Sequence, residues 1–184
     1  MKFSVDREDF LEALKRAKNA TERKSALPVL NNFLLVAEGD RLIIKATDLE
    51  NFLTFSVKAD VEEEGVLAVN ANKLTNVVKS LSSATVVAIS QEEKLSLIGG
   101  RSKFSLTAIN PEDFPEVPEV KTDTSMFARD LLKAIDKVEY AISKEDTRYA
   151  LQGMYVREYE NQTHFVGSDG HRLALYFINK AVPV

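Results

Sequence analysis

The sequence predicts an α+β fold built from a repeated β-α-β-β-β unit. Three observations support this prediction: a strand and an amphipathic helix open the chain, hairpin-like strands follow, and the same order restarts after a proline-rich stretch. The chain has 184 residues, which is room for one large domain or for one domain and part of a second.

The pattern of residues at the N-terminus predicts a strand followed by a helix. Met1–Val5 is expected to form a strand, and Asp6 is a good helix N-cap because its carboxylate can accept backbone N–H groups. Glu8 and Asp9 then suit the positive end of the helix dipole. Apolar residues recur at helical spacing along this segment, at Phe10, Leu11, Leu14, Ala17 and Ala20.

The rest of the first unit reads as strands with one more helix. Pro28 excludes a helix at its position, and Glu38–Asp40 is typical of a hairpin turn. A second helix is expected over Ala71–Leu81, where Leu74, Val77 and Val78 share one face. Strands are expected at Phe33–Ala37, Arg41–Thr47, Phe52–Ala59, Val66–Val69, Val86–Ser90, Lys94–Ile98 and Lys103–Ala108.

A gapless internal match supports the repeat. Pro111, Pro115 and Pro118 stand among acidic residues and predict an extended linker, after which a new strand and helix are expected near Thr124. Residues 121 positions apart are identical or similar in kind across a helix, a loop and three strands. The alternative is that any two segments of this kind share such periods. Identical pairs are Leu11 and Leu132, Ala13 and Ala134, Ala20 and Ala141, Leu30 and Leu151, and Asp48 and Asp169.

The repeat predicts two domains of unequal completeness. The first is expected over 1–121, and the second over 122–184 as an N-terminal half only, without counterparts of the second helix and the strands after it. Such a half domain leaves sheet edges and an apolar helix face uncovered. The chain is therefore expected to be a piece of a longer protein or a partner-dependent product.

Composition excludes several classes of protein. The chain has no cysteine, so disulfide and thiolate chemistry are excluded. The N-terminus turns acidic too early for a secretory signal, and no apolar run reaches the roughly 18 residues of a membrane span, so a cytoplasmic location is expected. The net charge of −4 argues against DNA binding, unless basic residues gather on one surface.

A set of ordered motifs resembles one family. The opening Met1–Val5, then Ala26–Asn32, Ala46–Glu50, Gly100–Leu106 and Asp113–Pro115 resemble the first domain of the bacterial DNA polymerase III beta subunit, the sliding clamp, and Arg148–Tyr149, Leu151–Met154 and Ser168–Ala174 resemble its second. The resemblance implies a DNA-clamp fold, in which each complete domain packs two helices against antiparallel sheets. It further implies a processivity factor in which two three-domain protomers close a ring around duplex DNA.

Candidate DNA contacts follow from this resemblance. Lys24 stands where the family places a DNA-contacting arginine, and Arg148 and Tyr149 stand in a loop that touches DNA in the family. Such contacts should be to phosphate, because base readout would stall a sliding protein. Glu145 and Ala150 depart from the family pattern and weaken the expected contact. Other basic candidates are Arg23, Lys73 and Lys79, although lysines near helix ends are often solvated residues that complement the dipole.

The cluster at Ser168–Leu173 has two interpretations. From the residues alone, Asp169–Gly170 predicts a tight turn between two strands, and neighbouring side chains on a strand point apart, which argues against a catalytic relay. The resemblance implies a cleft that takes a short peptide, with a glutamine and apolar anchors, from the polymerase III alpha subunit, the clamp loader or repair proteins. Leu151 and Leu173 would form its apolar wall, and Ser168, Gly170, His171 and Arg172 its rim.

An oligomer interface and two rival functions complete the expectations. The resemblance places Lys73, Leu74, Phe104 and Leu106 at the ring-closing interface, with core packing as the alternative for Leu74 and Phe104. An enzyme is disfavoured, because no phosphate-binding glycine loop and no nucleophile with its base is visible. No metal and no cofactor are expected. The second rival is a short product that binds replication partners without encircling DNA.

Overall fold

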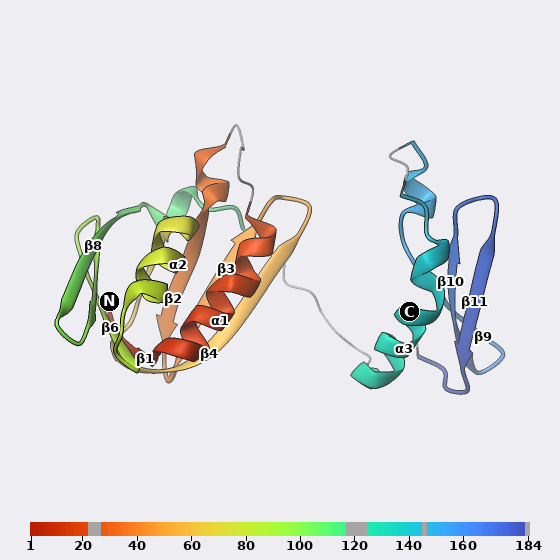
Figure 1. The fold of residues 1–184 in the computed structure, drawn as a ribbon, viewed down its shortest axis with the longest axis horizontal. Coiled ribbons are helices and arrows are strands. Elements are labelled where there is room, and N and C mark those ends of the chain that lie inside the picture. Colours follow the sequence, from red (N-terminus) through yellow and green to blue (C-terminus); the bar gives the residue numbers. More distant parts are fainter. Residues whose placement is uncertain (22–26, 117–124, 145–146, 183–184) are drawn as a thin grey trace. The chain divides into compact units, whose positions relative to one another are not determined.

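The computed structural model describes residues 1–21, 27–116, 125–144 and 147–182, which fall into two compact units (Figure 1). The first unit is Met1–Glu119 and the second is Val120–Val184. Within the described residues, no helix is long and apolar enough to cross a membrane.

The first unit opens with strand β1 (Lys2–Asp6) and helix α1 (Arg7–Ala17). The predicted N-cap is confirmed, since the Asp6 carboxylate accepts the backbone N–H groups of Glu8 at 2.8 Å and Asp9 at 3.1 Å. The α-helix ends at Ala17, because Lys18–Ala20 continues as a tighter 3₁₀ turn. Ala20 still lies in the core, as its spacing predicted.

Eight antiparallel strands form a closed ring in the order β1-β4-β3-β2-β5-β8-β7-β6. β4 runs beyond the expected Ala59 to Glu63, because its last residues pair with β1, as Val61 does with Phe3. The closing pair β1 and β6 joins residues 79 to 87 positions apart. The other strands are β2 (Asn32–Glu38), β3 (Arg41–Thr47), β4 (Phe52–Glu63), β5 (Gly65–Asn70), β6 (Thr85–Gln91), β7 (Lys94–Gly99) and β8 (Ser102–Ile109).

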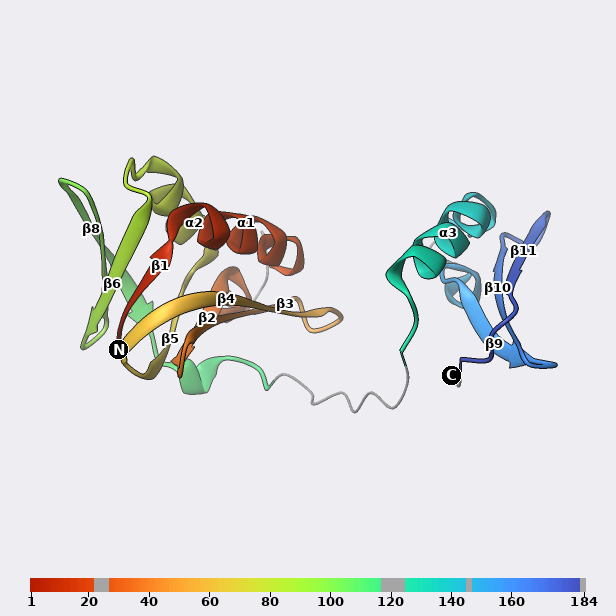
Figure 2. The ribbon, with the colours of Figure 1, turned by 90° about the horizontal axis from the view of Figure 1, so that it is seen from below.

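Helix α2 (Ala71–Ser80) packs beside α1, and both helices lie over the strands (Figure 2). Phe10 and Leu14 from α1 and Leu74 and Val78 from α2 are fully buried between the helices and the sheet. Leu74 therefore belongs to the core, which was the alternative to an interface role.

The second unit contains helix α3 (Ala128–Val138) and a three-stranded antiparallel sheet in the order β11-β10-β9. The strand expected near Thr124 lies outside the described residues. The helix covers one face of the sheet, where Ala134 and Val138 meet Phe165 and Ala174. The strands are β9 (Tyr155–Tyr159), β10 (Gln162–Ser168) and β11 (Leu173–Ile178).

The structure confirms the repeat in element bounds and in strand register. Both ends of α1 and of its 3₁₀ turn shift by 121 positions onto α3 and the turn Glu139–Ala141, and β3 shifts onto β10 in the same way. The pairing of Leu35 with Ile44 in β2 and β3 recurs, 121 positions later, as Val156 with Phe165. One backbone plan therefore serves both units.

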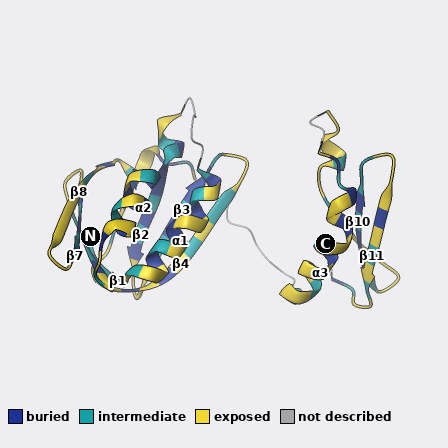
Figure 3. Cartoon of the chain, in the orientation of Figure 1, coloured by how far each residue is buried: buried dark blue, intermediate teal, exposed yellow. Residues whose placement is uncertain are grey.

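Equivalent helix positions differ in burial (Figure 3). Phe10 is 0% exposed in the first unit, whereas its counterpart Leu131 is 38% exposed, and the neighbouring Leu132 is 66% exposed. In the first unit α2 packs beside α1, whereas the described part of the second unit holds α3 as its only α-helix. An apolar face of α3 is therefore left exposed to solvent.

Truncation of the two equivalent side chains is expected to have unequal costs. Phe10→Ala should destabilise the first unit by about 3–5 kcal/mol, because it empties a fully buried site. Leu131→Ala should cost the second unit less than about 1 kcal/mol, since its side chain is already partly solvated. Amide hydrogen exchange, read separately for each unit, measures both losses. Equal losses at the two positions contradict the difference in packing.

The second unit is also expected to open more readily than the first. It has a smaller core and an exposed helix face, and local opening follows the number of buried apolar contacts. Amide protons of residues 122–184 should therefore exchange much faster than those of residues 1–110. Equal protection of the two segments, measured on the same sample, contradicts this expectation.

Candidate functional site

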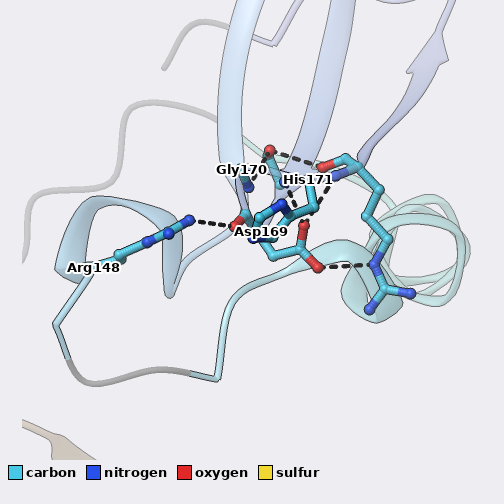
Figure 4. A network of polar contacts seen from close by, with 6 residues as sticks. Arg148, Asp169, Gly170 and His171 are labelled. Carbon is cyan, nitrogen blue, oxygen red and sulfur yellow. Dashed lines mark hydrogen bonds and ion pairs between the residues drawn. The ribbon is translucent and has the colours of Figure 1, made fainter.

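A tight turn between β10 and β11 carries a network of polar contacts (Figure 4). The Asp169 carboxylate accepts the backbone N–H groups of His171 and Arg172, each at 3.0 Å, and the Arg172 Nε at 2.9 Å. An aspartate that accepts the amides two and three residues later forms a compact Asx-type turn. This geometry confirms the turn predicted at Asp169–Gly170.

Two features of the structure favour glycine at position 170, in the centre of this turn. The φ of Gly170 is +86°, a region that other residues enter at a steric cost. A Cβ at this position would also lie 2.5 Å from Nη1 of Arg148. Ser168 completes the turn, because its hydroxyl accepts the Gly170 N–H at 3.2 Å and donates to the Arg172 carbonyl at 2.8 Å.

The turn depends on an ionised Asp169. Hydrogen bonds from the amides of His171 and then Arg172, with a smaller contribution from the Arg172 side chain, hold the pKa of Asp169 below its usual value. A carboxyl group with a lowered pKa stabilises the folded turn at pH values above its ordinary pKa. This stabilisation is lost as the pH falls through the lowered pKa.

The loop before β9 contacts the turn directly. Nη1 of Arg148 donates to the backbone carbonyl of Asp169 at 2.8 Å (Figure 4). The loop itself is closed by short-range bonds, from the Leu151 N–H to the Arg148 carbonyl at 2.8 Å and from the Ser143 N–H to the Leu151 carbonyl at 3.0 Å. Loop and turn therefore form one connected surface.

The 3₁₀ turn after α3, Glu139–Ala141, also contacts the turn between β10 and β11. The Arg172 guanidinium lies over the ring of Tyr140, 5.5 Å from its centroid. A hollow between them is lined by Glu139, Tyr140, Ile142, Ser143, Lys144, Asp169, His171 and Arg172. Two acidic and two basic side chains balance in this lining, so the hollow has no strong preference for an anion.

The structure brings the six predicted peptide-site residues together. Leu151 lies 3.8 Å from the position that a Cβ of Gly170 would take. Leu173 is 65% exposed at the start of β11, on the face of the sheet away from α3, because its neighbour Ala174 is buried toward the helix. The rim residues Ser168, Gly170, His171 and Arg172 are partly or fully exposed in the turn.

The apolar surface around Leu173 extends further than the sequence suggested. Leu175 and Phe177 follow on the same face of β11 and are 53% and 48% exposed. Tyr155 on β9 is 60% exposed, and both Tyr155 and Leu175 pair with Val166 of the central strand. Alternation along β9 and β11 could have indicated this face, because strands with one buried face place every second residue outside.

The predicted DNA-contacting residues lie in both units. Arg23 and Lys24 lie outside the described residues. Lys73 and Lys79 are exposed on α2 of the first unit. Arg148 and Tyr149 lie on the loop of the second unit, where the Tyr149 ring is 80% exposed. No pattern in the sequence indicated that Arg148 also contacts the Asp169 carbonyl.

The predicted interface residues of the first unit are divided between core and surface. Leu74 is fully buried, and Leu106 is partly buried against the same core. Lys73 is exposed and Phe104 is 37% exposed. Among the described strands, β8 pairs with β7 along its length but with β5 only at Ala108 and Ile109. The greater part of β8 therefore has an edge that no described strand covers.

Comparison with known proteins gives consistent matches along the chain. Residues 1–118 match the model of the family described as DNA polymerase III beta subunit, N-terminal domain, and residues 126–182 match the central domain of the same subunit. The beta sliding clamp of Pseudomonas aeruginosa is 36% identical over 187 residues, which cover 100% of this chain and 51% of the relative. That of Caulobacter vibrioides is 35% identical over 184 residues and covers 95% and 50%.

Solved structures agree with these matches. The DNA polymerase III subunit beta of Pseudomonas aeruginosa superposes with a TM-score of 0.90 at 36% identity, over 100% of this chain and 51% of that one. The beta sliding clamp of Caulobacter crescentus gives a TM-score of 0.88 at 32% identity, over 99% and 50%. These likenesses confirm the expected α+β clamp fold. The chain spans about half the length of the curated relatives it matches. With both family domains matched in order, this chain belongs to the family of the bacterial DNA polymerase III beta subunit.

Proposed function

We propose that this chain is part of a DNA sliding clamp, a non-catalytic processivity factor that encircles duplex DNA in the cytoplasm and tethers the replicative polymerase. The observation that carries the proposal is the ordered match of two clamp domains along the chain. The role requires binding surfaces rather than reacting groups, and no cofactor takes part in it. Residues 1–121 form one clamp domain, and residues 122–184 form the N-terminal half of a second.

The grip on DNA is sequence-independent and made to phosphate. Lys73 and Lys79 are exposed on α2, and Arg148 and Tyr149 are exposed on the loop before β9, which supports their roles as contacts. Arg23 and Lys24 join them by family position. A net charge of −4 does not oppose this grip, because the local arrangement of charge decides where a polyanion binds. Contacts to phosphate alone let the protein move along the duplex.

Partner proteins bind at the surface that the turn and the loop form. Leu151 and Leu173 supply the apolar wall, and the rim is Ser168, Gly170, His171 and Arg172. The occupant is a short peptide with a glutamine and apolar anchors, presented by the polymerase III alpha subunit, the clamp loader or a repair protein. Leu173 is exposed beside a turn whose backbone groups are hydrogen-bonded, so it can contact such anchors. Apolar anchors in small pockets supply most of the binding energy of an interface.

Ring closure in a homodimer uses the uncovered edge of β8. Phe104 and Leu106 lie on this strand, and Lys73 is exposed on α2. An open strand edge offers backbone donors and acceptors to a second sheet. Leu74 is buried beneath the same region, so it supports the interface from the core and does not contact the partner.

Charge reversal at a phosphate contact is expected to weaken retention on DNA. In the longest product of the gene that encodes this chain, Lys24→Glu should reduce the slope of log affinity against log salt by about 1, since one phosphate contact is lost. Retention on circular DNA over a salt series measures this slope. Lys94→Glu, an exposed lysine on β7, is the control and should leave the slope unchanged. Unchanged retention by Lys24→Glu excludes Lys24 as a contact.

Truncation of the apolar wall is expected to weaken peptide binding. Leu173→Ala should lower the affinity for a glutamine-containing peptide with apolar anchors by about tenfold or more, because an anchor pocket loses its wall. Leu132→Ala on α3 is a matched control, since Leu132 is 66% exposed and Leu173 is 65% exposed. Fluorescence anisotropy of a labelled peptide provides the measurement. Equal effects of the two substitutions argue against a site at Leu173.

A further inference from the structure

Arg148 stands where two candidate surfaces meet. The family resemblance assigns it to DNA, yet its Nη1 donates to the carbonyl of Asp169, inside the turn assigned to partner peptides. The charged donor makes this hydrogen bond stronger than one between neutral groups. The guanidinium of Arg148 therefore belongs to both the candidate DNA surface and the candidate peptide surface.

The absence of a side chain at Gly170 leaves room for the guanidinium of Arg148. Gly170 has no Cβ, and a Cβ there would lie 2.5 Å from Nη1 of Arg148 and 3.8 Å from Cδ1 of Leu151. With a side chain at position 170, the guanidinium of Arg148 would have to shift. The close approach of the guanidinium to the backbone thus depends on glycine at 170.

The first unit provides an internal comparison for this pair. Residues 121 positions earlier are Leu27, in place of Arg148, and Leu49, in place of Gly170. Leu49 has the same unusual backbone conformation, with φ of +77° against +86° at Gly170. The turn around Asp48 therefore holds a side chain at the position that glycine occupies in the second unit. Arginine and glycine occur together in one copy of the turn, and two leucines occur together in the other.

We propose that Arg148 is a positioning residue for the partner-binding turn, and that through it DNA binding and peptide binding are linked. The guanidinium holds the Asp169 carbonyl and so fixes the turn that displays Ser168, His171 and Leu173. A DNA phosphate that binds the same guanidinium changes the hydrogen bond from Arg148 to the Asp169 carbonyl. By thermodynamic reciprocity, a peptide that fixes the turn then changes the affinity for DNA by the same factor. The linkage rests on the proposed function, whereas the support of the turn by Arg148 does not.

Four variants of this chain separate support of the turn from other roles. Arg148→Leu introduces the residue of the first unit and removes the donor, and Arg148→Lys keeps a cationic donor. Gly170→Ala shifts the guanidinium while leaving it in the sequence, and it also strains the backbone at the positive φ of this position. Arg129→Leu is the matched control, because Arg129 is 88% exposed in the same unit and its ion pair is with its neighbour Asp130.

The first readout needs neither peptide nor DNA. The amide protons of His171 and Arg172, which Asp169 accepts, should exchange at least about threefold faster in Arg148→Leu and in Gly170→Ala. Exchange should recover in part in Arg148→Lys and stay unchanged in Arg129→Leu, while the amides of α3 stay as protected as in the parent chain. Unchanged exchange at both amides in Arg148→Leu overturns the proposal.

The second readout is affinity for the glutamine-containing peptide, followed by NMR so that weak binding is measurable. Without DNA, Arg148→Leu and Gly170→Ala should each weaken binding by about fivefold, and the double variant should be no weaker than either single one. A short duplex should change the peptide affinity of the parent chain and not that of Arg148→Leu. If Arg148 only contacts phosphate, Arg148→Leu will leave the peptide affinity measured without DNA unchanged. That result overturns the proposal. If the parent chain binds no peptide, the proposed function fails while the exchange measurement still decides the role of Arg148.

Discussion

Burial of one helix face against antiparallel strands is the constraint on which both units depend. Ala13, Ala17 and Ala20 fill the tight space beneath the first helix, and their counterparts Ala134, Val138 and Ala141 are buried in the second. Burial of these residues fixes the helix on the sheet in both units. The strand ends, and with them the turns and loops, are then placed in the same way in both copies.

The turn after the central strand shows what the repeat preserves and what it changes. In the first unit, the Asp48 carboxylate accepts the N–H groups of the residues two and three positions on, at 3.1 Å and 2.6 Å, as Asp169 does in the second. The hydroxyl before each aspartate accepts the amide two residues later. The backbone framework is thus common, while the outward groups differ. Glu50 and Asn51 of the first turn are replaced by His171 and Arg172 in the second.

Local signals in the sequence predicted most of the elements. Asp6 as N-cap, the bounds of β3 and the turn at Asp169–Gly170 all follow from interactions within a few residues. The extension of β4 to Glu63 was not predicted, because it depends on pairing with β1 near the other end of the unit. Closure of the eight strands into a ring is a long-range property of the same kind.

Sequence analysis predicted that the residues of the candidate site lie together, but not how they are connected. Family position brought Leu151 and the turn together correctly, as their proximity to Gly170 shows. The hydrogen bond from Arg148 to Asp169 joins residues 21 positions apart, and no periodic pattern encodes it. Leu74 is buried, as its helical spacing signals, and its place at an interface stays a prediction.

The division of labour between the two copies can be tested on the intact chain by NMR. Titration with a glutamine-containing peptide with apolar anchors should shift the amide signals of residues 148–151 and 168–175. The equivalent residues 27–30 and 47–54 share the backbone plan but lack the specialised side chains, so their signals should stay in place. Shifts of equal size in the two turns, or shifts confined to the first, contradict the assignment of partner binding to the second unit.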